Sequence, residues 1–168
     1  MKKILSIIII LLMASVLCYA AGTTTISSDQ VFKLQNGSRV RVIKVDFTAD
    51  ASTGAIASVT LAANGSTSGM NNGPLVGWKL SKILIDGNSG TTEVQEDSDM
   101  TITSSGYDIL GGAGTDMVDN SAERIITPID SNTVYDGIRI FADAVVAISS
   151  TTSVADARGT ELFIFEEE

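Results

Sequence analysis

The chain has 168 residues, of which 20 are acidic, 11 are lysine or arginine and none is histidine. Its single cysteine, Cys18, lies in the apolar N-terminal segment. Without histidine, neither a Ser-His-Asp triad nor a Cys-His pair can form, and a typical zinc site lacks its usual nitrogen ligands. The acidic balance also disfavours nucleic-acid binding, because phosphate groups are repelled by such a surface.

The first 20 residues have the features of a secretory signal peptide. Two lysines precede an apolar run from Ile4 to Leu17, and small residues follow near Ala20. We predict cleavage after Ala20, which leaves one domain at residues 21–168 with 9 basic and 20 acidic residues, a net charge of −11. The alternative is an uncleaved leader that anchors the chain, and only in this form is membrane association expected. The protein is accordingly expected to be exported to the extracellular space or the cell surface.

From Thr23 onward, short β-branched or aromatic runs alternate with clusters of Gly, Ser, Thr, Asn and Asp, which is typical of an all-β domain. Eight runs are predicted to be strands, at residues 39–47, 55–63, 75–86, 92–95, 100–104, 123–129, 135–149 and 161–167. No long amphipathic helix pattern separates them. Eight strands in one domain predict an antiparallel β-sandwich or a jelly-roll-like fold.

The run at residues 39–47 changes its hydrophobic phase near the middle. Val40 and Val42 share one face of the predicted strand, whereas Val45 and Phe47 share the other. A slip in a two-residue period indicates a bulge or a bend. We therefore predict a corner here, where the strand crosses from one sheet to the other.

The run at residues 75–86 shows the same change of phase between Leu80 and Ile83, so a second corner is predicted there. Trp78 is in register with Val76 and Leu80. This register favours a place for Trp78 in the core over a role as an exposed binding platform.

Two further segments carry structural predictions. Residues 62–74 are too polar to pack and too long for a tight hairpin, so a mobile surface loop is expected. The run from Leu162 to Phe165 is apolar on both faces, which predicts a strand that is either central in the sandwich or buried by a partner subunit. The acidic residues 166–168 are interpreted as a solvated end that limits aggregation.

Residues 111–116 read GGAGTD and match the G-G-x-G-x-D calcium turn of RTX-type β-roll repeats. Calcium takes about six to eight oxygen ligands, which such repeats supply from two neighbouring turns. Here Asp108 and Asp116 are eight residues apart, where a nonapeptide array needs nine, and the pattern does not recur after Asp119. We therefore interpret the segment as a turn whose glycines supply positive φ, and no cofactor is predicted. If calcium binds, its candidate ligands are Asp108, Asp116 and Asp119.

The sequence contains residues for two other kinds of site. A hydrolase with paired carboxylates has acids available at Asp86, Glu93, Glu96, Asp97 and Asp99. The run at residues 93–99 is more typical of a solvated acidic loop, and no enzymatic activity is predicted. A glycan-binding protein needs exposed rings, and the aromatic content is only 5%. The main aromatic candidates are Trp78, Tyr107 and Tyr135.

Five elements follow one another between Gly77 and Glu168: GWKLSKILID, DSDMTITSSGYDILGGAGTD, AERIITPI, YDGIRIFADAVVAIS and GTELFIFEE. This order resembles small β-rich proteins encoded among the structural genes of tailed bacteriophages. The resemblance implies a virion-associated or surface-displayed structural module, and it transfers no catalytic residues. The predicted leader favours display outside the cell.

We therefore expect a non-enzymatic structural or display module, either virion-associated or exposed on an extracellular surface. It is expected to act through self-association or assembly onto a larger particle or surface. The alternatives are a secreted binding protein, for example for glycans, and a secreted hydrolase that uses two carboxylates.

Overall fold

The computed structural model describes residues 22–65, 67–86, 98–118, 123–128, 137–149 and 155–167. These residues form an all-β, antiparallel structure, as predicted from the sequence. No helix among them is long and apolar enough to cross a membrane. The predicted leader at residues 1–20 and the predicted strand at residues 92–95 lie outside the described residues.

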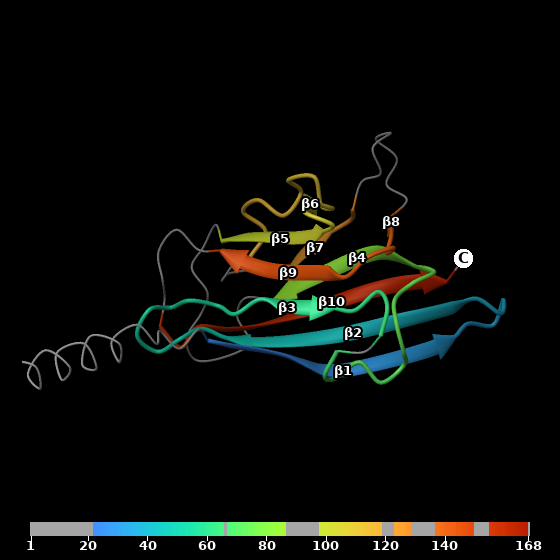
Figure 1. Cartoon of the computed structure of the whole chain (residues 1–168), viewed down its shortest axis with the longest axis horizontal. Coiled ribbons are helices and arrows are strands. Elements are labelled where there is room, and N and C mark those ends of the chain that lie inside the picture. Colours follow the sequence, from blue (N-terminus) through green and yellow to red (C-terminus); the bar gives the residue numbers. More distant parts are fainter. Residues whose placement is uncertain are drawn as a thin grey trace, which may run out of the picture.

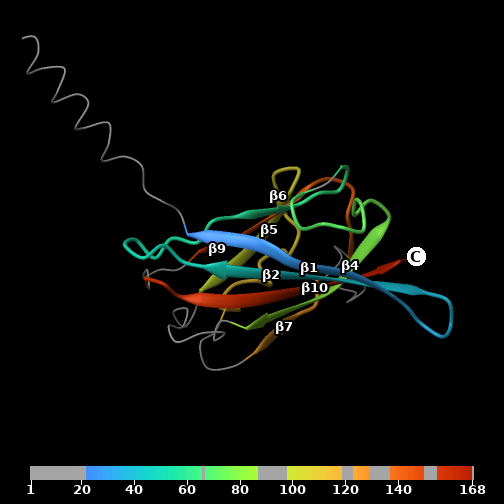
Figure 2. The same ribbon diagram turned by 90° about the horizontal axis from the view of Figure 1, so that it is seen from below.

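The described strands form two facing sheets (Figures 1 and 2). Their bounds are β1 Thr23–Lys33, β2 Arg39–Thr48, β3 Val59–Leu61, β4 Trp78–Asp86, β5 Asp99–Ser104, β6 Tyr107–Asp108, β7 Arg124–Ile126, β8 Ile138–Arg139, β9 Ala144–Ser149 and β10 Arg158–Glu167. Sheet A has the order β1-β2-β10-β4-β7, and β8 also pairs with β4. Sheet B has the order β3-β9-β5-β6.

The strand pairings are those of a jelly roll. When β1 and β8 are set aside, the first strand pairs with the last, the second with the last but one, and so on inward: β2 with β10, β3 with β9, β4 with β7 and β5 with β6. All four pairs are antiparallel, as expected for one long hairpin rolled into two sheets. The sequence left the sandwich and the jelly roll open, and these pairings decide for the jelly roll.

The core lies between the two sheets. Sheet A contributes buried side chains at Ile43, Val45, Phe47, Leu80, Ile83, Ile85, Phe163 and Phe165, and sheet B contributes Leu61, Met100, Ile102 and Val146. Trp78 is 8% exposed and belongs to this core, as predicted. Gly159 is needed for the packing, because a Cβ at this position would overlap the ring of Phe47.

The predicted corner in β2 is wrong. Arg41, Ile43 and Val45 are all buried on the same face of the strand, while Val40 and Val42 lie on the other face. The strand therefore keeps its two-residue period throughout. The sequence pattern indicated a change of hydrophobic phase because Arg41, a charged residue, occupies a core position. A charged residue in the sequence pattern predicts an exposed position.

The phase change in β4 is a bulge but not a corner. The register between β4 and β10 shifts between Ile164 and Phe165, so that Ser81 is an extra residue in β4. The Ser81 hydroxyl donates a hydrogen bond to the carbonyl oxygen of Ile164 at 3.1 Å. Because β4 pairs with β10 on both sides of this bulge, it stays in sheet A over its whole length.

Strand β10 is central in sheet A, which confirms one of the two alternatives predicted for the final run. It pairs with β2 on one side and with β4 on the other. Glu161, Phe163 and Phe165 face the core, while Leu162 and Ile164 point to the outer face of the sheet.

Candidate functional site

A buried ion pair connects sheet A to the loop before β4. Arg41 Nε and Nη2 donate to the two carboxylate oxygens of Asp29 at 2.8 and 2.9 Å, and neither side chain is exposed to solvent. The same guanidinium donates to the carbonyl oxygens of Gly73 and Pro74 at 2.8 and 3.0 Å. Arg41 thus provides hydrogen bonds that the loop backbone would otherwise make with water.

Asp29 binds the other part of the same loop. The backbone amides of Asn71 and Asn72 donate to its Oδ2 at 2.7 and 2.8 Å. Burial raises the pKa of Asp29, but the hydrogen bonds from Arg41 and Asn72 outweigh this effect and hold the pKa below its ordinary value. Met70 in this loop is 5% exposed and packs in the core. The expectation that residues 62–74 are too polar to pack is therefore wrong for the described residues.

Glu161 on β10 is a buried acid in an apolar part of the fold. Its neighbours in the ladders are Val45 on β2 and Ile85 on β4. The residue is 1% exposed, and its Oε1 receives no hydrogen bond from the described residues. Burial raises the pKa of Glu161 to about 8, so the carboxyl is protonated at neutral pH. A raised carboxyl pKa is also found in general acids, but this group is enclosed between the two sheets, out of reach of a substrate.

Asp108 organises the turn that follows β6. Its two oxygens accept hydrogen bonds from the backbone amides of Leu110 and Gly112, each at 3.0 Å. Gly111 and Gly112 have φ of 59° and 83°, which confirms that these glycines supply the positive φ of the turn. Gly114 has a different role, because a Cβ there would overlap a backbone carbonyl of β5.

Asp116 lies at the end of this turn, close to the start of β5. It adopts a φ of 54°, and its backbone amide donates to Asp99 Oδ1 at 2.9 Å. Asp119, the third calcium candidate, lies outside the described residues. Within the described residues no three acidic side chains gather as metal ligands do, and calcium binding by Asp108, Asp116 and Asp119 stays a prediction.

We expect the turn to depend on the Asp108 carboxylate and not on calcium. Asp108→Ala removes the acceptors of three backbone amides, those of Leu110, Gly112 and, at 3.4 Å, Ile102. It is expected to lower the free energy of unfolding by about 1–2 kcal/mol, or the thermal midpoint by about 3–6 °C. Asp108→Asn keeps one acceptor oxygen and is expected to have about half this effect.

Adding a calcium chelator is expected to leave the thermal midpoint of the unsubstituted protein nearly unchanged. A fall of roughly 10 °C on adding chelator would contradict this interpretation.

A shallow depression on sheet A brings two carboxylates together. It is lined by Leu84, Ile85, Asp86, Glu123, Thr160 and Leu162. Its volume is about 110 Å³, whereas ligand sites usually enclose roughly 300–1,000 Å³. Among the other acids considered for a hydrolase, Asp99 lies on sheet B, and Glu93, Glu96 and Asp97 lie outside the described residues. Asp86 and Asp99 thus lie in different sheets.

The aromatic candidates for glycan binding are dispersed. Trp78 is buried beneath two guanidinium groups, with the Cζ atoms of Arg39 and Arg41 at 5.5 and 5.8 Å from the ring centre. It is therefore not available as a platform for a sugar. Tyr107 is 78% exposed, and Tyr135 lies outside the described residues.

The outer face of sheet A carries an apolar patch, formed by Val42, Leu84, Ile125, Leu162 and Ile164. These residues are neighbours across the strands: Val42 pairs with Ile164, Leu162 with Leu84, and Leu84 with Ile125. Ile125 is 60% exposed and the other four are half-buried. In the sequence only one strand of this patch was visible, as the second apolar face of β10.

Comparisons with protein-family models, with curated proteins and with solved structures found no match. Jelly rolls occur in viral capsid domains, lectins and cupins, so this fold alone selects no function. The functional proposal below therefore rests on the buried groups and the surface of this chain.

Proposed function

We propose that the protein is a non-enzymatic structural or display module that acts through assembly, on a virion or on an extracellular surface. The observation that carries this proposal is the apolar patch on the outer face of sheet A. Its residues come from four adjacent strands and lie beside charged side chains. Contiguous apolar patches with a polar rim are typical of surfaces that bind another macromolecule.

The places of the ionisable groups in the fold support the structural reading. Asp29 and Arg41 hold a loop against sheet A, Asp108 holds a turn, and Glu161 is enclosed in the core. Each of these groups therefore has a role in the fold, or an environment that a substrate cannot enter.

The edges of the two sheets favour assembly through a face over assembly through an edge. The outermost strands β3 and β7 have three residues each and β6 has two. The longer edge strand β1 contains a bulge between Ile26 and Ser28, and the Asn72 side chain donates to the carbonyl oxygen of Asp29 in this strand at 2.8 Å. Short, bulged or covered edges prevent pairing with another strand.

Two sequence features support the alternative locations. The resemblance of residues 77–168 to structural proteins of tailed phages, together with the use of jelly rolls in capsids, supports a virion-associated module by analogy. The predicted leader supports display on an extracellular surface. Assembly through a sheet face is common to both.

The test is the mass of the protein in solution. The full sequence is expressed, the exported product is purified, and its mass is measured by light scattering over a range of concentrations. We expect the mean mass to rise above that of one chain as the concentration increases. A product that remains strictly monomeric at high concentration would rule out assembly with itself.

A further inference from the structure

Basic residues are confined to sheet A. Outside the predicted leader the chain has nine, and all lie in strands of this sheet: Lys33, Arg39, Arg41, Lys44, Lys79, Lys82, Arg124, Arg139 and Arg158. Arg41 is buried, which leaves eight at the surface. The acidic residues of sheet A that are not buried are four: Asp46, Asp86, Glu166 and Glu167. The surface of sheet A is therefore basic, although the whole chain is acidic.

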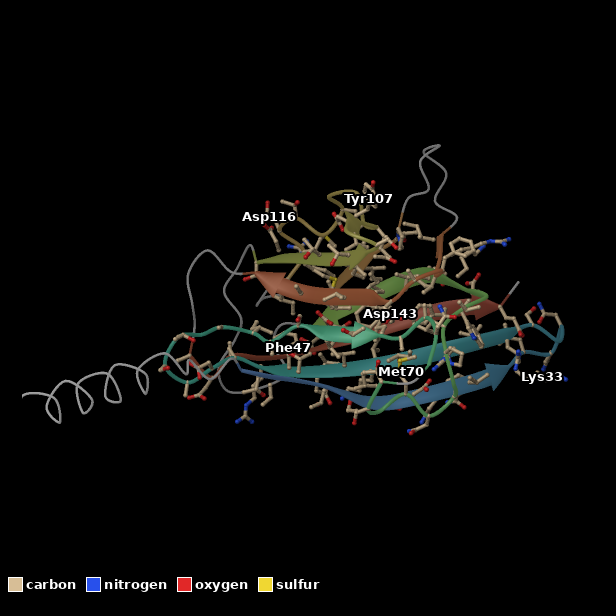
Figure 3. The ribbon with its side chains drawn as sticks, in the orientation of Figure 1. Lys33, Phe47, Met70, Tyr107, Asp116 and Asp143 are labelled. Atoms are coloured by element: carbon tan, nitrogen blue, oxygen red, sulfur yellow. The ribbon has the colours of Figure 1, made fainter. Side chains whose placement is uncertain are left out.

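The rest of the described chain has the opposite charge. It contains seven acidic residues and no basic ones: Asp50, Asp99, Asp108, Asp116, Glu123, Asp143 and Asp156. Three of these, Asp99, Asp108 and Asp116, belong to sheet B and the turn after β6. In Figure 2, β6 lies on the side of the molecule away from β10 and β7. Figure 3 shows Asp116 and Tyr107 beside β5 and β6. We call this surface the acidic side.

Charged side chains surround the apolar patch. In the ladders, Lys44 lies opposite Leu162 and Lys82 lies opposite Ile164. Lys79 and Arg139 lie opposite each other in the ladder between β4 and β8, further along the same face, and Arg158 lies on it opposite Thr48. The acids on this face are Asp46, Asp86, Glu123 and Glu166, and Lys44 contacts Asp46 at 3.0 Å. The outer face of sheet A thus combines an apolar centre with a rim of five basic and four acidic groups.

We propose that the outer face of sheet A binds the acidic side of a second copy of this chain. The inference rests on the proposed function and specifies the two surfaces that meet. Opposite charges favour this pairing, because the described basic residues all lie in sheet A and the acidic side contains none. The two surfaces differ, so a bound copy still presents one free surface of each kind. Copies therefore associate head to tail, into a closed ring or an open filament.

Two double variants each block one surface. The face variant, Lys82→Glu with Ile125→Glu, introduces negative charge into the patch and its rim. The acidic-side variant, Tyr107→Lys with Asp116→Asn, adds one positive charge and removes one negative charge. Tyr107 is 78% exposed, and asparagine tolerates the positive φ found at Asp116. Circular dichroism and the thermal midpoint verify that both variants fold.

A matched control makes the same kinds of change away from both surfaces. Lys33→Glu with Val76→Glu substitutes one basic and one exposed apolar residue, since Lys33 ends β1 and Val76 is 48% exposed. This control is expected to associate like the unsubstituted protein. It separates the effect of net charge from the effect of position.

We expect each blocking variant to weaken association on the order of a hundredfold, as measured by light scattering and sedimentation. An equal mixture of the two is expected to form dimers and nothing larger. The intact acidic side of the face variant can bind the intact sheet A face of the other, and both remaining surfaces are blocked. About 0.5 M salt is expected to weaken association of the unsubstituted protein, because the screening length falls to a few ångströms.

The outcomes separate this inference from the proposed function. If the unsubstituted protein assembles and the face variant assembles equally well, the outer face of sheet A is not the interface, and the proposed function stands. If both variants are monomeric and their mixture is monomeric too, the contact is not head to tail. If the unsubstituted protein is itself monomeric, this inference fails, and the proposed function is restricted to assembly on another particle or surface.

Discussion

A chain that ends at Thr160 is expected to give no soluble folded protein. The truncation removes most of β10, which pairs with both β2 and β4 and so joins the two halves of sheet A. It also removes Phe163 and Phe165, which are fully buried. Loss of one buried phenylalanine side chain costs about 3–5 kcal/mol, and a domain is stable by only about 5–15 kcal/mol. Soluble yield and circular dichroism of the product measure the effect.

A chain that ends at Phe165 is the matched control. It loses residues 166–168, and with them the ion pair between Arg39 and Glu167 on the surface. Exposed ion pairs contribute about 0–1 kcal/mol, so this chain is expected to fold and to aggregate more readily because three negative charges are gone. If the chain ending at Thr160 is soluble and well folded, β10 is dispensable and the central role assigned to it is wrong.

The strands that the sequence predicted are those with a strong apolar pattern. Strands β2, β4 and β10 were found at nearly their observed bounds, because their inward positions are mostly aliphatic or aromatic. Strand β1 was missed. Its sequence, TTTISSDQVFK, has few buried positions and contains a bulge, as an edge strand often does. Period-two patterns detect burial, and β1 has little of it.

The ion pair between Asp29 and Arg41 could not be predicted for the same reason. Asp29 lies opposite Ile43, and Arg41 lies opposite Val31, so the two charged residues are diagonal neighbours on the inner face. Opposite charges at inward positions of paired strands are a usable signal. It becomes visible only when both strands and their register are known, and β1 was not among the predicted strands.

The apolar patch was only partly visible in the sequence. The run from Leu162 to Phe165 indicated a strand that is apolar on both faces, with two explanations left open. The structure shows that β10 is central, and also that its second face, at Leu162 and Ile164, is only half-buried by the described residues. The contribution of Ile125 depends on register between strands distant in the sequence, which no local pattern contains.

The second large effect is expected at Glu161. Its pKa is raised from 4.5 to about 8 by burial, so the folded protein keeps this proton at pH values where the unfolded chain has released it. The free energy of unfolding therefore falls as the pH rises from about 4.5 to about 8 and is constant, for this group, outside that range. The total decrease that this shift implies is on the order of 5 kcal/mol. The opposite behaviour is expected of Asp29, whose pKa is lowered and whose contribution is lost in acid.

Glu161→Leu is therefore expected to stabilise the protein most in alkaline solution. Leucine fills a similar volume between Val45 and Ile85 and has no charge to bury. At pH 9 the thermal midpoint of this variant is expected to exceed that of the unsubstituted protein by about 10 °C. At pH 5 the difference should be much smaller, because this pH lies only slightly above the pKa of 4.5 of the unfolded chain, so most of the decrease has not yet occurred. Urea unfolding at pH 5, 7 and 9 gives the free-energy difference directly.

The variant Glu161→Gln separates two effects on stability: that of the charge and that of burying a polar group without a hydrogen-bond partner. Glutamine is neutral at every pH, so the decrease between pH 5 and 9 should disappear in this variant as it does in Glu161→Leu. The amide remains buried beside Val45 and Ile85 with little to bind, so Glu161→Gln should be less stable than Glu161→Leu by about 1–3 kcal/mol at all three pH values. If the unsubstituted protein and both variants lose stability with the same slope from pH 5 to pH 9, then the Glu161 carboxyl is not the group that titrates. The enclosed, unpaired environment assigned to it would then be wrong.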